Sequence, residues 1–131
     1  MSKYWLDYVK SCYDLVVESQ GITNVVLDHE IEAYVVHLMA NNFERTNIGA
    51  QAVAIQMLSA VQTGKRQQLL EVADECLIIH SYPFKKTRWP SPSYYKEIGT
   101  TAYGLAGHVM EDHFVPAAVV MNAIFSRKTG P

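Results

Sequence analysis

The sequence predicts an all-α fold, a single-domain bundle of five or six helices with a central antiparallel helix pair. Apolar residues recur every three or four positions through most of the 131 residues, as they do on the buried face of a helix. Clear helix starts occur at Asp28 and at Ser91-Pro92. No strand pattern occurs outside residues 22–27. One domain covering residues 1–131 is long enough to bury a hydrophobic core.

The first predicted helix covers residues 3–18, where aromatic and aliphatic side chains form an amphipathic pattern. We expect Gly21 to end this region and residues 22–27 to form a short connector with β-branched side chains. Asp28 is a good N-cap for a second helix, which the apolar stripe carries to about Phe43.

The third predicted helix starts at residue 49 or 50 and ends at Val61, with Thr63-Gly64 closing it. The fourth covers residues 65–81. Its second half is apolar nearly all round, which is typical of a central helix contacted from several sides. Tyr82-Pro83 ends it, because the residue before a proline resists helical geometry.

The fifth predicted helix starts at Ser91-Pro92, because serine can cap a helix and proline suits the first helical position. It extends to about Met110. We expect its three glycines to lie within the helix and to permit close approach of a neighbouring backbone, which would offset their low helix propensity. These glycines are Gly99, Gly104 and Gly107.

A sixth predicted helix follows a break near Asp112-His113 and runs to about Ser126. The break is needed because Pro116 would lie too far inside one unbroken helix. Placed after it, Pro116 falls in the first turn of the sixth helix.

Composition indicates an ordinary globular protein, with 49% hydrophobic and 18% charged residues. The formal net charge of -2 is too small to attract a polyanion or a polycation to the whole surface. No apolar run is long enough for a membrane span. Cys12 and Cys76 lack any metal-binding or redox spacing, so we expect reduced thiols. The expectation is a cytoplasmic chain without a membrane segment or cofactor.

One pattern between the fourth and fifth helices resembles an uncharacterised family of small all-helical bacterial proteins. It covers about a third of the chain and reads Asp74-x-x-Leu77, then Phe84, then Tyr94-Tyr95-x-x-x-Gly99-x-x-Ala102-Tyr103. The resemblance implies that the fourth helix, the next loop and the fifth helix form a unit. That family has no assigned activity, so the resemblance implies no functional residue.

Asp74 lies in the apolar half of the fourth helix, where a buried carboxylate needs a hydrogen-bond donor. We expect the donor to be the hydroxyl of Tyr94 or Tyr95, or a backbone amide at the start of the fifth helix. The functional alternative is an acid–base carboxylate with a raised pKa.

His80 follows Cys76 by four positions, so the two side chains share a helix face. A thiol–imidazole pair could act in nucleophilic catalysis. The simpler interpretation is a histidine that caps the helix beside a cysteine acting as a small hydrophobe. An interior pocket would be lined by Asp74, Cys76, His80, Tyr95 and Tyr103.

The closest approach to a metal-binding cluster is made by His108, Glu111, Asp112 and His113, but their spacing matches no established zinc or di-iron motif. His108 is in phase with the solvated face of the fifth helix. We therefore expect a solvated His–Asp pair and no metal.

The region 82–95 interleaves aromatic and basic side chains, a combination that suits partner binding. Because the chain as a whole is not basic, a protein partner or a homo-oligomer is favoured over a nucleic acid. The sequence thus predicts a non-catalytic helical module; the alternative is a small enzyme or ligand-binding bundle with the interior pocket around Asp74. The candidate partner-binding residues are Phe84, Lys85, Lys86, Arg88 and Trp89.

Overall fold

The computed structural model describes residues 3–42, 52–82 and 91–129. It confirms the all-α bundle. Of the expected partner-binding segment, Phe84, Lys85, Lys86, Arg88 and Trp89 lie outside the described residues. The elements in chain order are α1 (Lys3–Thr23), α2 (His29–Asn42), α3 (Val53–Thr63), α4 (Arg66–Ser81), α5 (Pro92–Leu105), a short 3₁₀ helix η1 (Val109–Asp112) and α6 (Phe114–Thr129).

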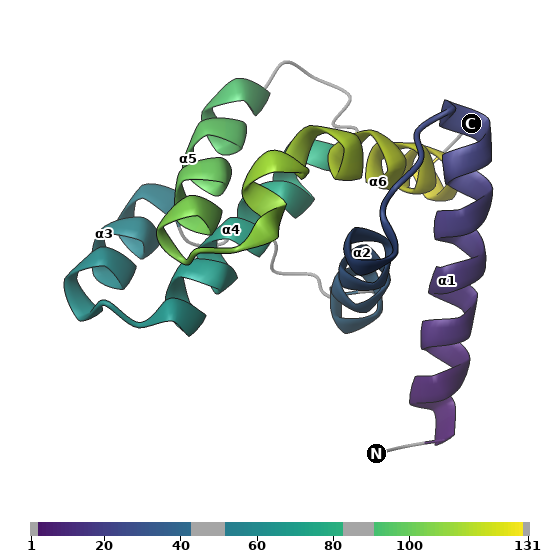
Figure 1. Ribbon diagram of the computed structural model, residues 1–131, viewed down its shortest axis with the longest axis horizontal. Helices are drawn as coiled ribbons and strands as arrows, with labels where there is room; N and C mark the ends of the chain where they lie inside the picture. Colours follow the sequence, from purple (N-terminus) through teal and green to yellow (C-terminus); the bar gives the residue numbers. More distant parts are fainter. Residues whose placement is uncertain (1–2, 43–51, 83–90, 130–131) are drawn as a thin grey trace.

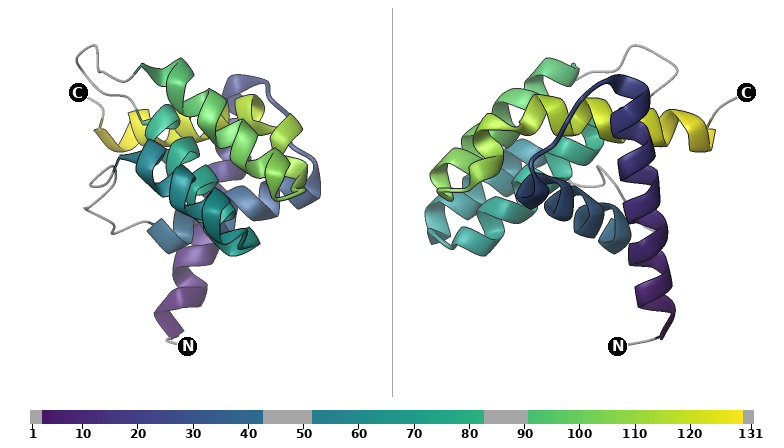
Figure 2. Two further views of the ribbon diagram at one scale, coloured as in Figure 1. Left: turned by 90° about the vertical axis from the view of Figure 1, so that its left-hand side faces the viewer. Right: turned by 45° about the vertical axis from the view of Figure 1, so that its right-hand side comes forward.

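Figure 1 shows α3, α4 and α5 at one end of the molecule and α1 and α2 at the other. Helix α6 packs against α1, α2, α4 and α5, so it connects the two ends. The amino-terminal half of α1 extends beyond its neighbours in each view (Figures 1 and 2). Within the described ranges, one face of that half therefore has no helix over it.

The central pair is α4 and α5, which run antiparallel. His80 near the end of α4 contacts Pro92 at the start of α5, and Asp74 in the middle of α4 contacts Tyr103 near the end of α5. Gly99 lies at a close contact between the two helices. A Cβ atom added there would stand 2.6 Å from Cε2 of Phe114 and 2.9 Å from Cβ of Cys76.

The core combines side chains from both ends of the molecule. Cys12 and Val16 of α1 pack with α2 and α6, as the first amphipathic pattern predicts. Apolar burial of this kind is the main source of stability in such a bundle. The largest fully buried side chains include Tyr103, Phe114, Ile31, Leu77, Ile78 and Met110.

Helix α1 is longer than the sequence pattern suggests, because Gly21 lies within it instead of ending it. The helix continues to Thr23, whose hydroxyl donates to the Ser19 carbonyl at 2.7 Å. Asn24 then adopts a positive φ of 57°. Asparagine tolerates this left-handed conformation, which often terminates helices. The expected connector is thus shortened at its beginning.

Helix α5 is shorter than expected, since it ends at Leu105 and not near Met110. Gly107, expected inside the helix, has a φ of 65° and turns the chain instead. Its amide donates to the carbonyl of Gly104 at 3.0 Å. The turn points His108 back toward the bundle, so it does not lie on a solvated helix face. Pro116 falls in the first turn of α6, as predicted.

Among the described residues, no helix combines the length and the hydrophobicity that crossing a lipid bilayer requires.

Candidate functional site

Asp74 is the centre of a hydrogen-bonded cluster that joins three helices. Its Oδ1 atom accepts the Tyr103 hydroxyl from α5 at 2.7 Å and also accepts the Tyr34 hydroxyl from α2. The two tyrosine rings lie edge to face, with centroids 6.1 Å apart. Tyr103 is fully buried, while Tyr34 and Asp74 are half-buried. We call Tyr34, Asp74, Tyr103 and His108 the Asp74 cluster.

His108 closes the outer side of the Asp74 cluster. Its ring centroid lies 4.8 Å from that of Tyr34 and 5.6 Å from that of Tyr103. The Met110 amide donates to Nδ1 of His108 at 3.1 Å. This bond places the proton of the neutral ring on Nε2. The imidazole is therefore held by both packing and a backbone hydrogen bond.

Burial controls the protonation of this cluster. Removal from water raises the pKa of the Asp74 carboxyl, although the hydroxyls of Tyr34 and Tyr103 oppose the rise. Burial also raises the pKa of both tyrosines, and the Asp74 charge raises it further. Burial and the nearby Arg66 guanidinium lower the pKa of His108. Each shift favours the neutral form of its group.

Arg66 also fixes the end of α5, because its Nε donates to the Ala106 carbonyl at 2.8 Å. The cluster and this contact together connect α2, α4, α5 and the turn that carries His108. Since both tyrosine protons are already directed at Asp74, neither hydroxyl is free to donate its proton to a ligand. This geometry suits a structural connection between helices.

The prediction that Tyr94, Tyr95 or a backbone amide at the start of α5 donates to Asp74 was wrong. Tyr94 and Tyr95 pack edge to face at the start of α5, with ring centroids 5.4 Å apart. Because α4 and α5 are antiparallel, the start of α5 lies beside the end of α4, where His80 meets Pro92. Asp74 is further back along α4 and faces Tyr103 instead.

Cys76 and His80 both lie near Phe114, but the contacts of each favour a structural role. Burial raises the pKa of the Cys76 thiol to about 12, which disfavours the thiolate that a nucleophile requires. His80 uses Nδ1 to pair with the Pro92 carbonyl at 2.7 Å, and its ring contacts Phe114. Tyr95 is buried in the same apolar cluster as Cys76. Asp74 and His80 contact different partners.

Among the described residues, no three His, Cys, Asp or Glu side chains lie close enough together to hold a metal ion. The expected pairing of His108 with Asp112 on one helix face was wrong. Helix α5 ends at Leu105, before either residue, and His108 caps the short 3₁₀ helix η1 that ends at Asp112.

An apolar groove lies at the other end of the molecule, between α1 and α2. It has a volume of about 330 Å³ and is open to solvent rather than enclosed. Its walls are mainly aliphatic and aromatic, with a few polar groups along the edge. The lining residues are Leu6, Val9, Lys10, Tyr13, Glu32, Ala33, Val36 and His37.

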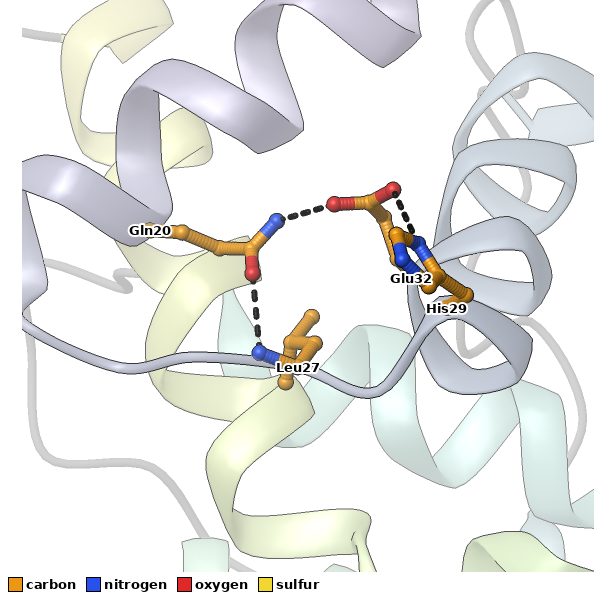
Figure 3. A network of polar contacts seen from close by, with 4 residues as sticks. All are labelled: Gln20, Leu27, His29 and Glu32. Carbon is orange, nitrogen blue, oxygen red and sulfur yellow. Dashed lines mark hydrogen bonds and ion pairs between the residues drawn. The ribbon is translucent and has the colours of Figure 1, made fainter.

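A polar clamp fixes the angle between the two walls of this groove. Nε2 of Gln20 on α1 donates to Glu32 on α2 at 2.7 Å, and the Leu27 amide donates to Oε1 of Gln20 at 2.8 Å (Figure 3). His29 also lies 3.9 Å from the Glu32 carboxylate. The side chain of Gln20 thus satisfies both the connector and α2, which makes the groove a preformed feature.

The groove continues into an exposed stripe along α1. Positions 6, 10, 13 and 17 follow one another at spacings of four, three and four, which places them on one side of the helix. Leu6 is 68% exposed, Tyr13 49% and Val17 43%. Exposed apolar side chains grouped on one side of a helix make that side a candidate interaction surface. We call Leu6, Lys10, Tyr13 and Val17 the α1 stripe.

Comparison of the chain with protein-family models, with curated proteins and with solved structures found no match in any of the three. The class that fold and site define is therefore an all-α bundle with a buried carboxylate cluster and an open apolar groove. Its function must be inferred from these two features.

Proposed function

We propose that the protein is a non-catalytic interaction module that binds an amphipathic helix of a protein in the α1–α2 groove. The observation that supports this proposal most strongly is the groove itself, which is preformed, apolar and open. Helix-in-groove recognition needs such a surface, into which the bound helix places apolar anchors at spacings of three, four and seven residues. Leu6, Val9 and Tyr13 form the apolar part of one wall.

The surroundings of the groove support a helix over a small molecule as the ligand. Small-molecule pockets usually enclose most of the ligand and direct several polar groups toward it. Here the Glu32 carboxylate already pairs with Gln20. Lys10 and His37 are exposed at the edge, where they can pair with charges that flank the apolar face of a helix.

The module is proposed to act in the cytoplasm, since Cys12 and Cys76 are both free and buried. Thiols that remain unpaired are typical of reducing compartments.

Site-specific photocrosslinking in the producing cells tests this proposal. Tyr13 is replaced by p-benzoylphenylalanine, and Gln67, exposed on α4, is replaced in a control. We expect a covalent adduct with a helical segment of a protein from position 13 alone, identified by mass spectrometry. Adding Ala33→Arg, which fills the groove, should abolish it. No adduct, or equal adducts from both positions, would contradict the proposal.

The alternative, a ligand-binding or enzymatic bundle using the Asp74 cluster, is favoured by one observation. A carboxyl with a raised pKa beside a histidine is an arrangement that acid–base sites use. The pocket proposed with it also includes Cys76 and His80. Its test is the effect of Asp74→Asn on any activity or ligand binding detected, because asparagine keeps the acceptor for the tyrosines but cannot transfer a proton.

A further inference from the structure

We infer that the helix bound in the groove is α1 of a second copy of this chain, in an antiparallel arrangement. This inference rests on the proposed function and adds the identity of the partner. The α1 stripe forms one wall of the groove and is also the exposed apolar surface beside it. One helix can therefore be both receptor and ligand, as a two-fold symmetric interface requires.

The order of residues along the α1 stripe is self-complementary. With a two-fold axis between positions 10 and 13, Leu6 lies opposite Val17 of the second copy. Lys10 lies opposite Tyr13 of the second copy, where an ammonium can pack over the ring. Leu6 thus meets an apolar side chain and Tyr13 meets an ammonium, and both contacts occur twice by symmetry.

Charge selects the antiparallel direction over the parallel one. Lys10 and Asp14 are both exposed on α1, one turn apart. In the antiparallel register Lys10 comes close to Asp14 of the second copy, and the symmetric pair forms as well. A parallel register would place Lys10 beside Lys10 and Asp14 beside Asp14. Like charges brought together in an interface are unfavourable.

The same arrangement covers both grooves at once. Each α1 would rest against Ala33 and Val36 on α2 of the other copy, because these residues form the opposite wall. The two α1 and two α2 helices would then form a four-helix layer. The clamp of Gln20 and Glu32 keeps each groove open before association, so little ordering is needed when the copies meet.

The contact is limited in length. The α1 stripe from Leu6 to Val17 covers about 16 Å at 1.5 Å per residue. Small interfaces bind weakly, so we expect a reversible dimer rather than a permanent one. Tyr13 is the expected anchor, since aromatic residues dominate binding energy in such contacts.

Sedimentation equilibrium of the purified full chain tests the inference across micromolar to near-millimolar concentrations. We expect a monomer–dimer equilibrium that Leu6→Glu weakens about 100-fold, since the contact between Leu6 and Val17 is lost twice by symmetry. Leu58→Glu is the matched control, because Leu58 on α3 is 60% exposed against 68% for Leu6. This control should leave the dimer unchanged.

Two further variants test the charge pairing. Lys10→Glu and Asp14→Lys should each weaken self-association by about 10-fold, from two lost exposed ion pairs plus repulsion. Mixing the two variants should restore dimers, because each introduced charge then meets its opposite. The direction of the helices can be tested by mixing the single variants Lys10→Cys and Tyr13→Cys and oxidising the mixture. An antiparallel dimer should give mainly the disulfide between position 10 of one variant and position 13 of the other. A parallel dimer would instead favour the disulfide between two copies of the Lys10→Cys variant.

A chain that remains monomeric throughout overturns the inference, as does a dimer that Leu58→Glu disrupts and Leu6→Glu does not. The proposed function is judged separately by the adduct from position 13. An adduct of twice the 14.8 kDa chain mass supports the second copy. An adduct with a different protein overturns the second copy and keeps the groove as the binding surface.

Discussion

Around Asp74, ionisable and hydroxyl groups lie inside the protein, whereas along α1 aliphatic and aromatic side chains lie outside it. The first region satisfies its polar atoms internally, through two tyrosine hydroxyls and the imidazole packed on their rings. The second region leaves Leu6 and Tyr13 in water although a groove runs beside them. Burial of polar groups here connects helices, and we propose that the exposed apolar groups serve binding. The following predictions test that division.

Loss of the Asp74 carboxylate should have the largest effect on folding. Asp74→Ala removes the acceptor of two tyrosine hydroxyls, and each buried hydroxyl left without a partner costs about 1–3 kcal/mol. We expect the free energy of unfolding, measured in urea, to fall by about 2–4 kcal/mol. Glu71→Ala on the exposed side of the same helix is the control. A change below about 0.5 kcal/mol would show that the cluster does not hold the helices together.

Gly99→Ala should destabilise by about 1–3 kcal/mol, because its Cβ would press on Phe114 and on Cys76 where no space exists. Gly104→Ala provides the comparison. Its Cβ would meet only the end of the exposed Glu111 side chain, which can move away. That variant should be neutral or gain up to about 1 kcal/mol from helix propensity. Equal losses at both positions would contradict close packing of α4 on α5.

The pH dependence of stability should report the buried carboxyl. The folded pKa of Asp74 lies above its ordinary value of 3.8, so the folded state binds more protons than the unfolded state between these two values. Stability contributed by this group is therefore lost as pH rises through that window. Asp74→Asn lacks the effect, so the variant should gain stability relative to wild type from about pH 4 toward neutrality. If the difference in unfolding free energy between Asp74→Asn and wild type stayed the same at every pH, the raised pKa of Asp74 would be contradicted.

The stability that His108 contributes should depend on pH with the opposite sign. Its folded pKa is lowered below 6.5, so its contribution to stability is lost as pH falls through the interval from 6.5 down to the folded value. NMR titration of the imidazole should give a pKa below 6.5. The value should fall further in Asp74→Asn, because the Asp74 charge raises it in wild type. An unchanged pKa of His108 in Asp74→Asn would show that the Asp74 charge does not act on the imidazole.

Substitutions on the α1 stripe should have the smallest effect on the monomer. Leu6→Gln and Tyr13→Gln replace exposed side chains, so the free energy of unfolding should change by less than about 0.5 kcal/mol at concentrations where the chain is monomeric. Val16→Gln, at the fully buried position of the same helix, should instead unfold much of the protein. A large loss from the exposed pair would mean that these side chains serve folding rather than binding.

The sequence predicts the helices well because their signals are local. Pro92 and Pro116 mark the starts of α5 and α6, and Gly64 ends α3 with a φ of 66°. Local signals are weaker for glycine, which occurs both inside helices and in the turns that end them. Gly21 lies inside α1 and Gly107 makes a turn, although both are glycines in otherwise helical patterns.

The candidate site is predicted only in part, because its contacts are distant in the chain. Asp74 and Tyr103 belong to the predicted set and do meet. Tyr34 lies 40 residues before Asp74, and only the placement of α2 brings its hydroxyl to the carboxylate. His108 reaches the cluster through the turn at Gly107. Periodicity likewise marks Leu6 and Tyr13 as apolar but cannot say whether a neighbouring helix covers them.

The central claim is that binding occurs on the α1 stripe and its groove while the Asp74 cluster serves the fold. Amide NMR spectra recorded at increasing protein concentration test it directly. We expect concentration-dependent shifts at positions 6, 10, 13 and 17 and at the facing α2 residues 33 and 36, with Asp74 and Tyr103 unchanged. Shifts centred on the Asp74 cluster or on the exposed face of α3, or none at any concentration, would contradict the account.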